Sequence, residues 1–84
     1  MPVNEARFNS GLMVLSGDIE SGTIRKGDRV KISNGMQLAV YRIVVGGEQR
    51  QQATAGEEAS LAFSGVERGE EHLFSKPGLT VSKD

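Results

Sequence analysis

One stretch of this sequence constrains the fold more than any other, because glycines interrupt it where a pair of strands would have to turn. It spans residues 17–32. A strand ends at Ile19, a connection passes through Gly22 to a tight turn at Gly27, and a second strand opens at Arg29. Glycine adopts positive φ angles at little cost, so this spacing predicts a corner between two strands of a small barrel.

Composition supports an all-β fold in one domain. The 84 residues are enough for one hydrophobic core and too few for two, which predicts a single domain over residues 1–84. Eleven of them are glycine, a share that favours short strands and many turns over long helices. The chain has a net charge of −1, which exerts no overall attraction on nucleic acid. Any RNA binding would therefore need a local basic patch.

The chain lacks the residues or motifs of several common functional sites. It has no cysteine and one histidine, which excludes disulfides, thiolate metal sites and multi-histidine metal sites. Neither glycine-rich phosphate-binding motif occurs, and no serine sits in a nucleophile elbow. We therefore expect no enzymatic activity, no catalytic residue, no metal, no cofactor and no nucleotide. The start of the chain resembles no signal peptide and no apolar run could span a membrane, which predicts a cytoplasmic protein without membrane contact.

Apolar spacing predicts the first hairpin. Two strands flank residues 9–11, which read as a three-residue loop. That loop places Phe8 opposite Leu12 and Ala6 opposite Val14. Both pairs are apolar, as expected for one buried face.

A second hairpin follows the glycine-rich corner. A loop of residues 33–35 places Ile32 opposite Met36 and Val30 opposite Leu38. A two-residue turn would place polar side chains opposite apolar ones on both faces. The three-residue loop is therefore predicted, because a slip of one residue would expose half of the buried face.

The alternation of apolar and polar residues breaks beyond Val40. Apolar side chains then occupy both phases of the strand, which a β-bulge or a strand buried on both sides would explain. Residues 46–52 read as a polar loop. The next strand, residues 59–64, places Ala59, Leu61 and Phe63 on one face.

Basic residues offer a candidate RNA contact. Arg29 and Lys31 share a strand face, and Arg42 and Arg50 lie on elements predicted to be neighbours. Such a group could bind phosphates through charge-assisted hydrogen bonds. The alternative is that these side chains only solvate the outer face of the barrel.

Three ordered segments resemble the second, β-barrel domain of elongation factor Tu and related translational GTPases. The first segment has the pattern Gly17-x-Ile-Glu-Ser-Gly22-Thr-Ile-x-x-Gly27-Asp28-x-Val. The second is Ala-Gly-Glu at 55–57 with Gly-Val at 65–66, and the third joins 67–69 to Lys-Pro-Gly at 76–78. Three segments in the right order are more specific than a single glycine motif.

The resemblance implies a small closed six-stranded Greek-key β-barrel of the translation-protein type, standing without a GTPase domain. Within it, Gly17, Gly22, Gly27 and Asp28 would specify the fold. The family's contacts with the aminoacyl end of tRNA would fall at Val44, at Gly46 or Gly47, and at Glu58. Valine in place of a carboxylate, and glutamate in place of an asparagine, imply that aminoacyl-tRNA recognition is not inherited in its usual form.

These expectations lead to a non-enzymatic binding module related to translation factors. Its partner would be a protein or a ribonucleoprotein, with transfer RNA or ribosomal RNA as candidates. Arg29, Lys31, Arg42 and Arg50 would supply the phosphate contacts. The alternative is a small-molecule-binding or regulatory β-barrel with no role in translation, which would use a pocket at Val44, Gly46, Gly47 and Glu58.

Overall fold

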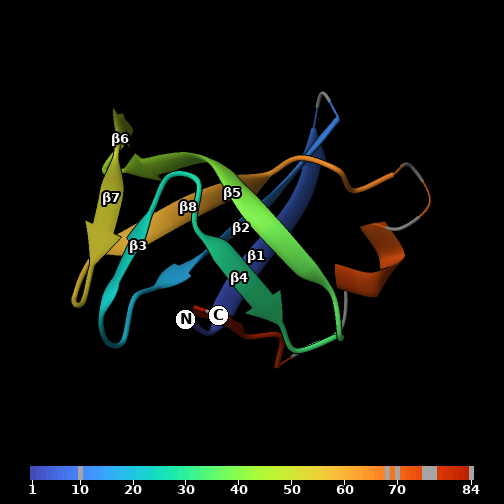
Figure 1. Ribbon diagram of the computed structural model, residues 1–84, viewed down its shortest axis with the longest axis horizontal. Coiled ribbons are helices and arrows are strands. Elements are labelled where there is room, and N and C mark those ends of the chain that lie inside the picture. Colours follow the sequence, from blue (N-terminus) through green and yellow to red (C-terminus); the bar gives the residue numbers. More distant parts are fainter. Residues whose placement is uncertain (10, 68, 70, 75–77, 84) are drawn as a thin grey trace.

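Short strands make up most of the computed structural model, which describes residues 1–9, 11–67, 69, 71–74 and 78–83. In the described part the strands are β1 (Val3–Asn9), β2 (Leu12–Asp18), β3 (Thr23–Arg25), β4 (Arg29–Ile32), β5 (Gln37–Val45), β6 (Glu48–Arg50), β7 (Gln52–Thr54), β8 (Glu58–Phe63) and β9 (Val81–Lys83). A 3-10 turn, η1 (Glu71–Phe74), precedes β9. The all-β prediction is confirmed (Figure 1). No helix in these described ranges is long and apolar enough to cross a membrane.

The strands form two sheets whose order brings distant parts of the chain together. The larger sheet has seven strands, with the order β1-β2-β8-β5-β4-β9 and with β6 paired to β5. The smaller sheet contains β3 and β7. All of the pairings between these strands are antiparallel. β8 therefore lies between two strands, β2 and β5, that precede it by many residues.

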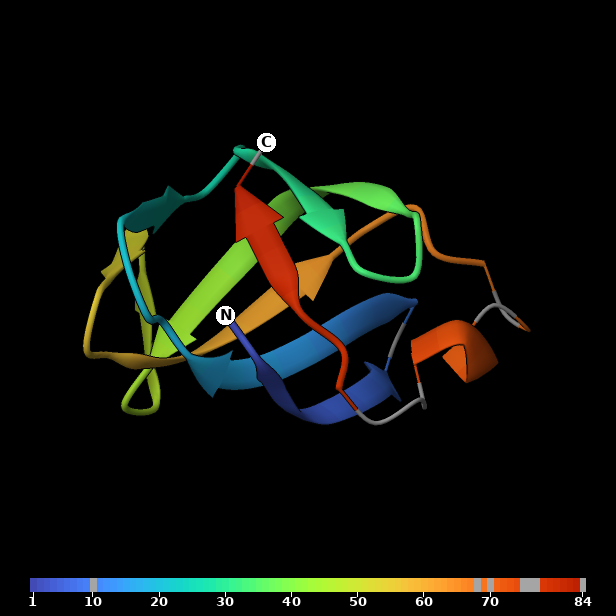
Figure 2. The same cartoon turned by 90° about the horizontal axis from the view of Figure 1, so that it is seen from below.

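The two ends of the larger sheet approach each other, and Figure 2 shows β9 beside the start of the chain. Pro2 and Thr80 form an isolated antiparallel bridge. Val3 N donates to Leu79 O at 2.8 Å, and Val81 N donates to Met1 O at 2.9 Å. A bridge is not a ladder, so the described sheet is not continuously closed. The predicted closed barrel of six strands is thus confirmed only as an all-β fold, and the described strands number nine.

One hydrophobic core lies on the inner face of the larger sheet and under the β3–β7 pair. Its members are largely the alternate apolar residues of the strands, as the period of two requires. The fully buried larger side chains are Met13, Leu15, Val30, Ile43, Leu61, Phe63 and Val81. The predicted inward face of β8 is confirmed, since Ala59, Leu61 and Phe63 are all buried.

The register of the β4–β5 hairpin agrees with the sequence prediction. Val30 pairs with Leu38 and Lys31 pairs with Gln37. Ile32 N donates to Met36 O at 2.8 Å, which closes the loop of residues 33–35. The three-residue loop is confirmed.

The predicted register of the first hairpin is wrong by one residue. Phe8 pairs with Met13 and Ala6 pairs with Leu15, while β1 extends to Asn9. Ser10, which belonged to the predicted loop, lies outside the described residues. Both phases of β2 are apolar, so either register satisfies the pattern. Packing against β8 selects the phase that buries Met13 and Leu15.

Two features after Val40 complete the comparison. The predicted bulge is confirmed, because the pairing of β5 with β8 shifts between Val40 and Arg42. The predicted polar loop at 46–52 is wrong, because β6 folds back on β5 and β7 begins at Gln52. Each strand has only three residues, and Ala53 is the one buried residue among them, so no apolar alternation marks them in the sequence.

Candidate functional site

The corner at residues 17–32 is a structural element, as predicted, but it holds an additional strand. β3 lies between the two turns and pairs with β7. Gly22 and Gly27 have φ angles of 74° and 93°. A residue with a Cβ would adopt these angles only at a cost in conformational energy. Gly17 has a different role, because a Cβ placed there would be 2.0 Å from the backbone oxygen of Pro2. The corner thus depends on glycine both for turning and for close approach.

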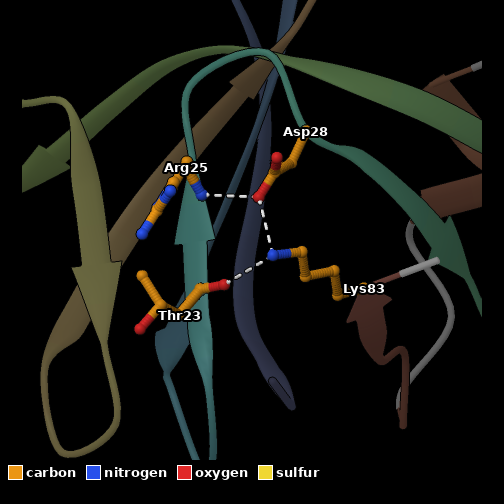
Figure 3. A network of polar contacts seen from close by, with 4 residues as sticks. All are labelled: Thr23, Arg25, Asp28 and Lys83. Atoms are coloured by element: carbon orange, nitrogen blue, oxygen red, sulfur yellow. Dashed lines mark hydrogen bonds and ion pairs between the residues drawn. The ribbon is translucent and has the colours of Figure 1, made fainter.

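Asp28 connects this corner to the last described strand (Figure 3). Its Oδ2 accepts a hydrogen bond from Arg25 N at 2.9 Å and lies 3.3 Å from Lys83 Nζ. Lys83 Nζ also donates to Thr23 O at 3.4 Å. The bond from the Arg25 backbone is the main cause that lowers the pKa of Asp28 below its ordinary value of 3.8; partial desolvation opposes it, and Lys83 adds to it. Asp28 therefore helps to hold β9 against the corner.

This lowered pKa predicts a pH-dependent loss of stability in Asp28→Asn. A carboxyl group with a folded-state pKa below its unfolded-state pKa stabilises fully above the unfolded value and loses that effect as the pH falls toward the folded value. The variant should be less stable than the wild type at neutral pH, and the two should converge as the pH falls below the ordinary value of 3.8 and through the lowered pKa of the folded state. Urea denaturation across this pH range measures the difference. A difference that stays constant with pH would contradict an ionic role for Asp28.

The four predicted basic residues lie on exposed surfaces of adjacent strands. Arg29 and Lys31 project from β4, opposite Ala39 and Gln37 of β5. Arg42 on β5 and Arg50 on β6 line one hollow of about 150 Å³. The structure therefore brings Arg42 and Arg50 together, while Arg29 and Lys31 lie on the next strand of the sheet.

The hollow also contains residues outside the four candidate phosphate contacts. Lys26 and Tyr41 line it with Arg42 and Arg50, and the other lining residues are Ile43, Gln49 and Gln51. Lys26 lies at the hollow because a hydrogen bond joins the turn before β4 to the residue after β6. Lys26 N donates to Gln51 O at 2.9 Å. Figure 1 shows that turn beside β5. We call Lys26, Tyr41, Arg42 and Arg50 the basic cluster. The break in alternation at Tyr41 was the sequence signal for its position.

Two contacts order the basic cluster. The Arg42 guanidinium carbon lies 5.7 Å from the centroid of the Tyr41 ring, within the range of a cation–π contact. Arg50 Nε lies 3.7 Å from a carboxylate oxygen of Glu48. An exposed ion pair of this length contributes little to stability, so Arg50 can exchange Glu48 for another anion at small cost.

The four predicted pocket residues come together. Val44, Gly46, Gly47 and Glu58 line a second hollow of about 300 Å³, with Ser60 as the fifth lining residue. Gly46 and Gly47 form the turn between β5 and β6. Val44 pairs with Ser60 across the sheet.

The chemistry of this hollow is that of an apolar wall with one acidic side. Val44 supplies an apolar surface, and among the described residues that line the hollow Glu58 alone is charged. Ser60 is less available to a ligand, because its Oγ lies 2.8 Å from Ser16 Oγ. In the described ranges no three histidine, aspartate or glutamate side chains gather where they could hold a metal ion. The hollow is suited to an uncharged or cationic group.

No family model matches the chain. Elongation factor Tu 2 of Streptomyces avermitilis is 35% identical over 75 residues, which cover 81% of this chain and 18% of that protein. Elongation factor SelB of Methanococcus maripaludis, in its apo form, matches the fold with a TM-score of 0.84 and 24% identity over 100% of this chain and 18% of its own length. A bacterial selenocysteine-specific elongation factor, EF-Sec, has a TM-score of 0.81 and 25% identity over 98% of this chain and 14% of its own.

The chain therefore spans less than a fifth of each of these proteins. The sequence likeness covers most of the chain, and the structural likeness extends over the whole fold. Together they confirm that the chain is related to translation elongation factors and is similar to the second, β-barrel domain of elongation factor Tu.

Proposed function

We propose that residues 1–84 form a single non-enzymatic binding module that docks on a ribonucleoprotein through RNA phosphates. The contact surface is the exposed basic face of β4, β5 and β6. The observation that carries the proposal is the convergence of Lys26, Arg42 and Arg50 on one hollow beside an exposed tyrosine. The relation to translation elongation factors supports a cytoplasmic, RNA-containing partner such as transfer RNA or ribosomal RNA.

Charge distribution supports this surface. The net charge of −1 provides no general attraction for RNA, so affinity must come from local clusters. Arg29 and Lys31 add two cations on the strand next to β5. Guanidinium groups bind phosphate oxygens with two hydrogen bonds at once, which makes the two arginines of the hollow suitable contacts.

The titratable groups support a non-enzymatic role. No polar or charged residue in the described part of the chain is buried, so no carboxylate occupies the apolar setting that raises a catalytic pKa. Asp28 and Glu57 have lowered pKa values, but both have structural causes. Glu57 accepts hydrogen bonds from the backbone N–H and the hydroxyl of Thr54, each at 2.8 Å, and these lower its pKa.

A salt titration tests the RNA contact. The wild type should bind transfer RNA or a ribosomal RNA fragment with an affinity that falls as salt rises, because each phosphate contact releases counterions. Replacing Arg29, Lys31, Arg42 and Arg50 together with glutamine should reduce the slope of log K against log salt by about 3 to 4. Four exposed substitutions should leave the thermal unfolding nearly unchanged. Absence of saturable RNA binding at low salt would refute the proposal.

The second hollow supports a small-molecule function as the alternative. Its volume of about 300 Å³ is at the lower end of the range for ligand pockets, and its apolar wall and acidic side fit a small cationic or neutral molecule. An NMR fragment screen tests this alternative. Fragments that shift the amide signals of Gly46, Gly47 and Glu58, and that bind more weakly to Glu58→Gln, would favour a small-molecule function. A protein that binds RNA but no fragment would refute it.

A further inference from the structure

Among the described residues, Tyr41 is the only large hydrophobic side chain that is exposed, with 49% of its surface accessible. Two of the other apolar members of β5, Val40 and Ile43, are buried in the core. Tyr41 follows the buried Val40, so the alternation of the strand directs its ring outward. The β5 bulge then brings a second exposed side chain next to it.

The bulge places an aromatic ring and a guanidinium group side by side on the surface. Val40 pairs with Phe63 and Arg42 pairs with Ala62, so Tyr41 is the extra residue of the bulged strand. In a regular strand consecutive side chains point to opposite faces, and Arg42 would then point inward. Here both Tyr41 and Arg42 are exposed, and Ile43 returns to the core. The bulge thus creates a pairing of side chains that a regular strand cannot present.

Cations from two other segments surround this pair. Lys26, from the turn before β4, and Arg50, from β6, line the hollow with Tyr41 and Arg42. A hollow of about 150 Å³ is too small to enclose a drug-sized ligand, but it is open to a phosphate group beside the ring. Gln49 and Gln51 add hydrogen-bonding side chains at its border.

We propose that the basic cluster is a subsite for one unstacked nucleotide, whose base stacks on Tyr41 and whose phosphate is bound by Lys26, Arg42 and Arg50. Aromatic side chains accept the face of any base, and that face is free only where RNA is single-stranded. The module therefore selects single-stranded segments over duplex RNA, without strong sequence preference. This inference rests on the proposed function and names the form of RNA that the basic face recognises. It differs in position from the hollow at Val44 and Glu58.

Fluorescence anisotropy on the whole chain tests the subsite. The probes are a labelled single-stranded oligouridine of about 12 nucleotides and an RNA duplex of the same length. The single strand should bind more tightly than the duplex. Tyr41→Ala should weaken single-strand binding about 5- to 160-fold, the range for loss of one base–aromatic stack. Tyr41→Phe should retain most of the affinity, because it keeps the ring.

A gain-of-affinity variant separates the subsite from damage to the fold. Glu48 is the acid nearest to Arg50 among the ion pairs of the described residues, so Glu48→Gln should strengthen oligouridine binding several-fold by freeing that guanidinium for phosphate. A misfolded protein would not bind more tightly. The Arg29→Gln, Lys31→Gln double variant is the matched comparison, since it removes two cations of the same face outside the basic cluster.

The outcomes distinguish the two proposals. Equal affinity for single strand and duplex, or an unaffected Tyr41→Ala, would overturn the nucleotide subsite; if the Arg29→Gln, Lys31→Gln variant also lost affinity, the RNA-docking function would stand. Binding of a polyglutamate peptide in place of either RNA would overturn both and would assign the cluster to an acidic protein partner. Loss of affinity in Tyr41→Ala with rescue by Tyr41→Phe supports both.

Discussion

Replacing Gly17 with alanine should lower the free energy of unfolding by about 3 kcal/mol, at the upper end of the range for overpacked sites. For a domain of this size, that loss corresponds to a decrease in Tm of roughly 12 to 24 °C. The new Cβ would lie 2.0 Å from Pro2 O and 3.1 Å from Pro2 C, and both are backbone atoms that cannot rotate away. The start of the chain would have to move from its bridge to Thr80.

Gly22→Ala is the matched control. Gly22 has a φ of 74° and no atom within 4 Å of an added Cβ, so alanine there incurs only the cost of a left-handed backbone, about 1 to 2 kcal/mol. Thermal and urea denaturation, followed by circular dichroism, measure both variants. Equal losses at the two positions would show that the approach of Pro2 to Gly17 is not what requires glycine. A larger loss at Gly17 would show that the close approach of Pro2 is what requires glycine there.

Phe63→Ala should cost about 3 to 5 kcal/mol, the usual range for removing a buried phenylalanine. Phe63 is fully buried on β8, where it pairs with Met13 of β2 on one side and with Val40 of β5 on the other. Truncation would leave a cavity where the central strand contacts both of its neighbours. A chain of 84 residues has a total stability of roughly 4 to 13 kcal/mol, so this variant should lose a large fraction of its stability and unfold at a clearly lower temperature than the wild type.

Phe63→Leu tests whether lost volume is the cause. Leucine keeps much of the apolar volume, so its cost should be well below that of alanine. Urea denaturation of both variants, with the m-value compared to the wild type, gives the two free energies. A loss below about 1 kcal/mol for Phe63→Ala would show that the core relaxes to fill the site.

The resemblance to the translation-factor domain could be inferred from sequence because its signals are backbone requirements. Positive φ angles at Gly22 and Gly27 restrict the residue type whatever surrounds them, so the pattern is readable without knowledge of neighbours. The β4–β5 register was also readable, since only one loop length places Val30 opposite Leu38. Gly17 was identified as part of the motif, but the reason for it, the proximity of Pro2, required the structure.

The candidate sites also differ in how far the sequence predicted them. The positions of Val44, Gly46, Gly47 and Glu58 in one hollow could be expected from the resemblance, and the structure gathers them there. The basic cluster was only half foreseen. Arg42 and Arg50 were named from their charge, whereas Lys26 joins them through a backbone hydrogen bond to Gln51, a contact between segments that the sequence does not link. The break in alternation beyond Val40 was noted, but the exposure of Arg42 beside Tyr41 depends on which residue of β5 is left unpaired by β8.

By itself, therefore, the sequence determined that the chain is all-β, where its glycine turns lie and which family of domains it resembles, because those properties depend on local backbone geometry and on the period of apolar residues. Tertiary structure decided the register of the first hairpin, where both phases of β2 are apolar and only packing against β8 distinguishes them. It also decided that the polar segment at 48–54 forms two strands, and that Lys26, Tyr41, Arg42 and Arg50 form one surface. These outcomes depend on partners distant in the chain, whose free energies of pairing and burial no local pattern contains.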